Sequence, residues 1–205
     1  MGPIHARWLL IALVAMRASV ASAAPPSGAA MTQHDMKQQL AAMAEAASAP
    51  TDAHRALAML VGRFDEITEV RMGPGEPMRA HSVCTAQWVM GGRFVRLESS
   101  AAPDEELKGD RLVVYGYDPA AKKYTLWNVE SGSLTAVTAL GDYDSTSKTL
   151  TFVGERDQSG VGKVPMRWVL RAEAGGVIAQ TIALKFPGAP DFVQVVSVRR
   201  TPLHP

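Results

Sequence analysis

Apolar and polar side chains alternate with a period of two through most of this chain, from Arg63 to Arg200. Turn residues such as Gly91–Gly92 and Pro187–Gly188 interrupt the alternation about every ten to seventeen residues. Successive side chains of a strand point to opposite faces, so the pattern predicts strands that each bury one face. Glycine and proline supply the backbone angles that tight connections need. The pattern predicts ten strands, at residues 63–72, 78–89, 93–99, 110–117, 124–129, 134–140, 148–154, 164–172, 177–186 and 192–200.

An open sheet of ten antiparallel strands would leave two unpaired edges, which tend to pair with other chains. Closing the sheet removes both edges, so we expect an all-β fold, an antiparallel up-and-down barrel of about ten strands. The barrel domain is placed at residues 51–202, a length that suits one domain. Barrels of more than eight strands can enclose a cavity, so an internal ligand site is physically allowed.

The first 23 residues follow the pattern of a secretory signal peptide. An apolar run at residues 8–16 follows Arg7, and the small residues Ala21-Ser22-Ala23 provide a cleavage site. The run is too short to span a bilayer and Arg17 follows it, so we expect cleavage after Ala23 and no membrane anchor. The mature protein is therefore predicted to be periplasmic or secreted, without an integral membrane segment.

Residues 24–50 are expected to hold a flexible tail, at residues 24–30, and a first short helix. This helix begins near Thr32, which can form a capping box with Asp35, and it ends before Pro50. Its apolar positions recur at helical spacing; they are Met36, Leu40 and Met43.

A second short helix is expected between Thr51 and Gly62. Thr51 or Asp52 can cap its start, and Gly62 can take the left-handed conformation that often ends a helix. Its apolar stripe consists of Ala53, Leu57, Leu60 and Val61. Such a helix could close one end of the barrel.

Charge and cysteine content narrow the function classes. The chain has a formal net charge of +1, and removal of residues 1–23 takes away two arginines and no acid, which leaves −1. A near-neutral chain without a basic run is a poor partner for nucleic acid, and Arg199–Arg200 is interpreted as a solvated strand end. Cys84 is the only cysteine, so an intrachain disulfide is excluded and we expect the thiol to be buried.

No metal, cofactor or catalytic motif stands out. The histidines lack the spacing of metal ligands; His54 is interpreted as a capping or packing residue, with an axial haem ligand as the alternative. The carboxylates of Asp65-Glu66 point to opposite faces of a strand and are interpreted as solvated charges. Three aspartates lack the spacing of a calcium loop and are expected in turns; they are Asp142, Asp144 and Asp157.

Several motifs, in their order and spacing between Met31 and Arg200, resemble the bacterial family called domain of unknown function 1579. They are His54-x-x-Leu57-x-x-Leu60-Val61-Gly62-Arg63-Phe64, Met72-Gly73-Pro74-Gly75, Gly91-Gly92-Arg93-Phe94, Gly116-Tyr117-Asp118 with Lys122-Lys123-Tyr124, and Lys148-Thr149-Leu150-Thr151. The resemblance implies a calycin-like barrel, as in lipocalins and fatty-acid-binding proteins, in proteins that are often exported. It implies no catalytic residues.

Aromatic residues in separate predicted strands provide the candidate site, because a ligand cavity is usually lined by such side chains with a few polar groups. An arginine that points inward could bind a ligand carboxylate, and strand alternation allows only one of Arg93 and Arg96 to do so. The candidate cavity residues are Trp88, Arg96, Tyr117, Trp127 and Trp168.

Three function classes follow from this interpretation. The leading hypothesis is an exported binding protein that holds a small apolar or amphiphilic ligand inside the barrel. The alternative is a structural or interaction protein whose barrel is packed solid and whose helices or an edge hairpin contact a protein partner. An enzyme is the least favoured class, because no catalytic residue, metal ligand or cofactor site is predicted.

Overall fold

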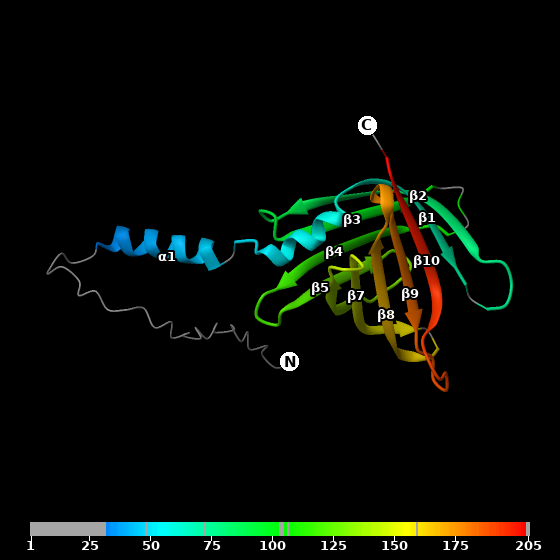
Figure 1. Cartoon of the computed structure of the whole chain (residues 1–205). Coiled ribbons are helices and arrows are strands. Elements are labelled where there is room, and N and C mark those ends of the chain that lie inside the picture. The colour runs from blue at the N-terminus through cyan, green and yellow to red at the C-terminus, as the bar shows by residue number, and fades with distance from the viewer. Residues whose placement is uncertain are drawn as a thin grey trace, which may run out of the picture. The chain divides into compact units, whose positions relative to one another are not determined.

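The computed structural model describes residues 32–47, 49–71, 73–102, 105, 107–158 and 160–203. The predicted signal peptide at residues 1–23 and the predicted tail at residues 24–30 lie outside the described residues. The chain divides into two compact units, Met1–Ala44 and Glu45–Pro205. All the described strands belong to the second unit (Figure 1).

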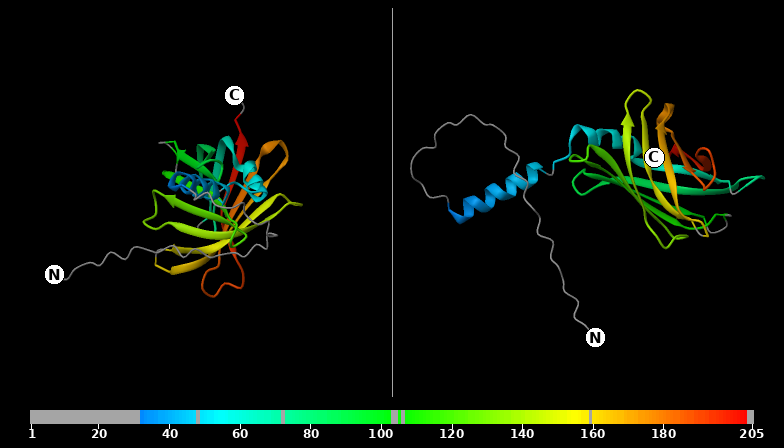
Figure 2. Two further views of the ribbon diagram at one scale, coloured as in Figure 1. Left: turned by 90° about the vertical axis from the view of Figure 1, so that its left-hand side faces the viewer. Right: turned by 90° about the horizontal axis from the view of Figure 1, so that it is seen from below.

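Ten antiparallel strands close into a barrel, which confirms the predicted fold class. Each strand pairs with the next one along the chain, and the last strand returns to pair with the first. Figure 2 shows the strands wrapped around one interior from two further directions. The strands are β1 (Gly62–Val70), β2 (Met78–Val89), β3 (Phe94–Ala101), β4 (Asp110–Asp118), β5 (Lys123–Glu130), β6 (Val137–Asp144), β7 (Thr149–Gln158), β8 (Gly162–Ala172), β9 (Ile178–Leu184) and β10 (Val193–Pro202).

The hairpin of β6 and β7 differs most from the prediction, because both strands continue past a glycine at which a strand end was expected. A Cβ atom on Gly141 would lie 2.5 Å from the carbonyl oxygen of Thr151, and one on Gly154 would lie 2.5 Å from that of Thr138. These glycines therefore allow a close approach inside the hairpin and do not mark turns.

The extension of β6 and β7 corrects two of the three predicted turn aspartates. Asp142 lies inside β6 and Asp157 inside β7, so their assignment to turns was wrong. Asp144 ends β6, and its carboxylate accepts hydrogen bonds from the Thr146 amide (2.9 Å) and the Ser147 hydroxyl (2.7 Å). This is the local bonding that makes aspartate common in turns.

The first helix, α1 (Gln33–Ala47), lies where it was predicted. Thr32 and Asp35 form the predicted capping box, since the Asp35 amide donates to Thr32 Oγ1 (3.2 Å) and the Thr32 amide donates to Asp35 Oδ2 (3.0 Å). The apolar side chains of Met36, Leu40 and Met43 are exposed. Among the helices that the structure describes, none combines the length and hydropathy needed to cross a bilayer.

The second helix is a 3₁₀ helix, η1 (Asp52–Leu60). It buries His54, Leu57 and Leu60, a spacing of three that matches the three residues per turn of a 3₁₀ helix. The Nδ1 atom of His54 accepts a hydrogen bond from the Thr51 amide (2.9 Å), which confirms His54 as a capping residue.

Gly62 does not end η1 as predicted. Val61 is the residue that follows the last turn, and its amide donates to the Ala58 carbonyl. Gly62 is the first residue of β1 and has φ of 152°. A Cβ atom there would lie 3.0 Å from the ring of Phe64, so glycine is needed both for the backbone angle and for the space.

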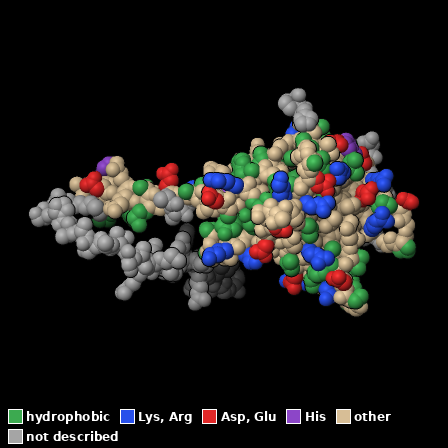
Figure 3. Space-filling view, in the orientation of Figure 1, with side chains coloured by type: hydrophobic (Ala, Val, Ile, Leu, Met, Phe, Trp, Pro, Cys, Tyr) green, Lys and Arg blue, Asp and Glu red, His purple; other side chains and the backbone are tan. Residues whose placement is uncertain are grey.

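The helix η1 packs against β3 and β4 at one end of the barrel, which is called here the η1 end. The core fills the barrel starting at this end. Leu57 and Leu60 of η1 join inward side chains of β1 to β9 in one apolar cluster. Cys84 is fully buried in that cluster, as predicted. On the outside, Figure 3 shows basic and acidic side chains interspersed over the visible face of the second unit.

Candidate functional site

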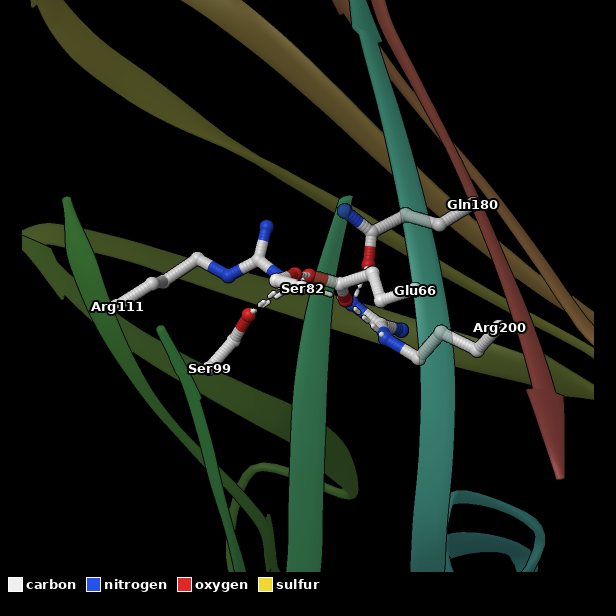
Figure 4. A network of polar contacts seen from close by, with 6 residues as sticks. All are labelled: Glu66, Ser82, Ser99, Arg111, Gln180 and Arg200. Carbon is white, nitrogen blue, oxygen red and sulfur yellow. Dashed lines mark hydrogen bonds and ion pairs between the residues drawn. The ribbon is translucent and has the colours of Figure 1, made fainter. Parts of the chain in front are cut away.

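Six strands each contribute one polar side chain to a network inside the barrel, shown in Figure 4. Strand pairing brings these positions together, because Glu66 lies opposite Ser82 on one side and Arg200 on the other. Glu66 and Arg200 are each only 1% exposed. Their interpretation as solvated charges was therefore wrong. The six residues are Glu66, Ser82, Ser99, Arg111, Gln180 and Arg200.

The carboxylate of Glu66 is the centre of this network. Arg111 Nη2 donates to both of its oxygens at 2.7 Å, and Arg200 Nε donates to Oε2 at 2.7 Å. The hydroxyls of Ser99 (2.8 Å) and Ser82 (3.0 Å) donate to Oε1. Arg200 also donates to Gln180 Oε1 at 2.8 Å, which extends the network to β9. Charge-assisted bonds of this kind are the strong ones in proteins.

Glu66 is ionised despite its burial. Burial alone opposes ionisation, but the guanidinium groups of Arg111 and Arg200, with the hydrogen bonds from Ser99 and Arg200, outweigh it and lower the pKa of Glu66 to about 2. Two arginines and one carboxylate leave one positive charge in excess inside the network.

The buried neighbours Cys84 and Tyr115 add no negative charge to the network. Burial raises the pKa of the Cys84 thiol to about 11 and that of the Tyr115 hydroxyl to about 12. Both groups are therefore neutral at physiological pH. The same values make the buried groups poorly suited to acid–base or nucleophilic chemistry, which needs a pKa close to the working pH.

A cavity of about 550 Å³ lies in the half of the barrel farther from η1. The apolar part of its wall comes mainly from β1, β6, β8, β9 and β10, and β4, β5 and β7 contribute polar side chains. Arg111 lines the cavity and so connects it to the network around Glu66, called here the charge network. A volume in this range, with a wall that combines apolar and polar side chains, is typical of small-molecule sites. The apolar wall residues are Val70, Val137, Met166, Ile182, Leu184, Phe186, Val193, Val195 and Val196.

Charged residues of the cavity wall are three arginines and one glutamate. Arg156 Nη2 donates to Glu130 Oε1 at 2.5 Å, so this pair is neutral as a unit. Arg71 follows β1 directly and is exposed. The cavity wall is therefore positive overall.

Of the five predicted cavity residues, only Trp168 lines this cavity. Arg96 and Trp127 lie between buried neighbours on their strands and point outward, with Trp127 40% exposed. Their placement in the interior was wrong, because alternation fixes which residues share a face and not which face is inside. Arg96 instead pairs with Glu98 on the outer surface.

Tyr117 and Trp88 lie at the η1 end and do not reach the cavity. Tyr117 packs edge-on against His54 with ring centres 5.7 Å apart and lies 5.1 Å from the ring of Tyr124. Trp88 shares the inward side of β2 with Ala86 but stands at the strand end, where it is 36% exposed. The five residues therefore do not form one site.

Comparisons with known proteins give a family for this chain and a solved structure with a similar fold. The model of the family described as "Protein of unknown function (DUF1579)" matches residues 49–175, more than half of the chain. The chain belongs to the DUF1579 family. Among solved structures, Rv2717c from M. tuberculosis has a TM-score of 0.57 and 11% sequence identity, over 76% of this chain and 100% of that one. At this identity the likeness shows the fold alone. No curated protein matches the chain.

Sequence reasoning missed the inward position of Arg200 in this DUF1579 protein for a reason that lies in β10. The pairing of β10 with β9 shifts between Gln194 and Val196, which is a β-bulge. The bulge turns Val196, Val198 and Arg200 inward. The signal that could have revealed the bulge is the spacing of four valines. Val193 and Val195 form one alternating apolar series, Val196 and Val198 form a second one, and no polar residue separates the two series.

Proposed function

We propose that this DUF1579 protein is an exported binding protein that holds a small amphiphilic ligand in the cavity of the barrel. The observation that carries the proposal is the cavity of about 550 Å³, with apolar walls and an arginine connected to a buried charge network. A barrel packed along its whole length, as the structural alternative requires, would not contain it. The groups buried around Glu66 do not have pKa values that favour an enzyme.

Export is supported by the sequence alone, through the signal-peptide pattern of residues 1–23. We expect the intact mass of the protein recovered from outside the cytoplasm to be that of a chain that begins at Ala24. An intact mass that includes residues 1–23 would contradict cleavage.

A fluorescence titration with the neutral probe N-phenyl-1-naphthylamine tests ligand binding. The wild type is expected to bind the probe with one site per chain. Val70→Trp adds a bulky ring to the cavity wall and is expected to weaken binding at least about tenfold, since the ring occupies space that the probe needs.

The matched control is Val83→Trp, which adds the same ring at an exposed position on the outer side of β2. It should bind the probe like the wild type, and thermal unfolding should show that both variants are folded. Absence of probe binding by the wild type, or equal binding by both variants, would rule out the cavity as the binding site.

A further inference from the structure

We propose that the ligand carries an anionic group, which binds Arg111 while the apolar body of the ligand packs against the apolar side chains of the cavity wall. This inference rests on the proposed binding function and names the chemical class of the ligand. Arg111 joins the cavity to the charge network, and its side chain is only 15% exposed.

The first argument is the number of donors that Arg111 has left. It uses one nitrogen, Nη2, for both oxygens of Glu66. Its Nε has no hydrogen-bond partner among the described residues, and Figure 4 shows its other terminal nitrogen directed away from Glu66. A guanidinium group presents five N–H donors and binds carboxylates and similar anions well, so Arg111 can serve a second anion.

The second argument is charge. Arg111 and Arg200 share the carboxylate of Glu66, and Tyr115 and Cys84 are neutral, so the network around Glu66 carries one positive charge in excess. A buried charge without a counter-charge is costly. An anionic group of a ligand at Arg111 would neutralise this network.

The third argument is the distribution of surfaces. Trp168, which is 2% exposed, also lines the cavity and has an Nε1–H without a partner among the described residues. Among the described residues, Asn128 Oδ1 is the one buried acceptor of the cavity wall that has no hydrogen-bond partner. Val70, Ile182 and Leu184 make other parts of the wall apolar. A wall that offers both unpartnered polar atoms and apolar side chains suits an amphiphile.

Two fluorescent probes that differ by one sulfonate test the inference: 8-anilinonaphthalene-1-sulfonate and the neutral N-phenyl-1-naphthylamine. The wild type is expected to bind the anionic probe at least about tenfold more tightly. Arg111→Met should remove this preference, so that the ratio of the two affinities falls to about one. Arg96→Met is the matched control, because Arg96 lies on the outer face of the neighbouring strand, and it should retain the preference.

Arg111→Met also removes a partner of Glu66, so Arg111→Lys, which keeps the positive charge, is measured beside it. Near-ultraviolet circular dichroism confirms that each variant is folded before titration. The lysine variant should retain part of the preference.

Each outcome separates this inference from the proposed function. If the wild type binds both probes equally, or the neutral one more tightly, the anionic ligand is excluded while the cavity stands as a binding site. If a folded Arg111→Met variant keeps the preference, the role of Arg111 is excluded. If neither probe binds, the proposed function itself fails.

Discussion

Glu66 is the residue on which the interior of this barrel depends most. Its carboxylate accepts hydrogen bonds from side chains of four other strands, contributed by Ser82, Ser99, Arg111 and Arg200. These bonds connect β1 to its neighbours and, through Arg111, to β4 across the interior. The buried Arg200 and the partly buried Arg111 both depend on this one anion, so its loss leaves both uncompensated.

Glu66→Gln is therefore expected to lower the free energy of unfolding by about 3–5 kcal/mol at pH 7, the usual cost of breaking a buried ion pair. Chemical denaturation measures the difference. Glu98→Gln is the matched control, because Glu98 is exposed and its contact with Arg96 is 3.5 Å long; it should cost under about 1 kcal/mol. Equal, small effects of the two substitutions would show that the network contributes little to stability.

The pH dependence of stability provides a second test of Glu66. Its pKa is lowered from 4.5 to about 2 in the folded protein, so the stabilisation is complete above about pH 4.5 and is lost as pH falls toward 2. The difference in unfolding free energy between wild type and Glu66→Gln should shrink by roughly 2 kcal/mol between pH 6 and pH 3. A difference that stays constant over this range would mean that the carboxyl is not held ionised.

At the scale of elements, η1 completes the core at its end of the barrel. Leu57 is fully buried, and Tyr124 Oη donates a hydrogen bond of 2.8 Å to the Ala53 carbonyl, so η1 is attached by both packing and polar contact. The spacing of three between the buried side chains of η1 reflects its 3₁₀ geometry.

Leu57→Ala is expected to lower the free energy of unfolding by about 2–5 kcal/mol, because it leaves a cavity among buried neighbours. Thermal or urea unfolding checks this value. Arg55→Ala, at a position of η1 whose side chain is 81% exposed, should change stability by less than about 0.5 kcal/mol. A Leu57→Ala variant as stable as the wild type would show that η1 does not belong to the cooperative core.

The existence and order of the strands could be predicted from alternation and turn residues, whereas some of their details could not. Gly141 and Gly154 were taken as strand ends because glycine is common in turns, but they lie inside β6 and β7 where two backbones approach closely. The bulge in β10 changed which residues face inward. Such features depend on the neighbouring strand, about which the local sequence carries no information.

At the scale of the whole molecule, closure of the sheet followed from the need to protect strand edges, and it is observed. The cavity could be expected only as a general property of barrels, and its wall residues could not be chosen. Of the predicted set, Trp168 lines it and Trp127 lies outside. Arg111 was missed because its ion pair with Glu66 joins residues 45 positions apart in the sequence.

A crystal structure of the protein with 8-anilinonaphthalene-1-sulfonate tests the binding site most directly, because it shows where the ligand lies. The expected result is a single probe inside the barrel, with its rings against Val70 and Ile182 and its sulfonate within hydrogen-bond distance of Arg111. A probe bound only on the outer surface, for example beside the exposed Trp127, Leu140 and Val153, with none in the cavity, would contradict a ligand site inside this barrel.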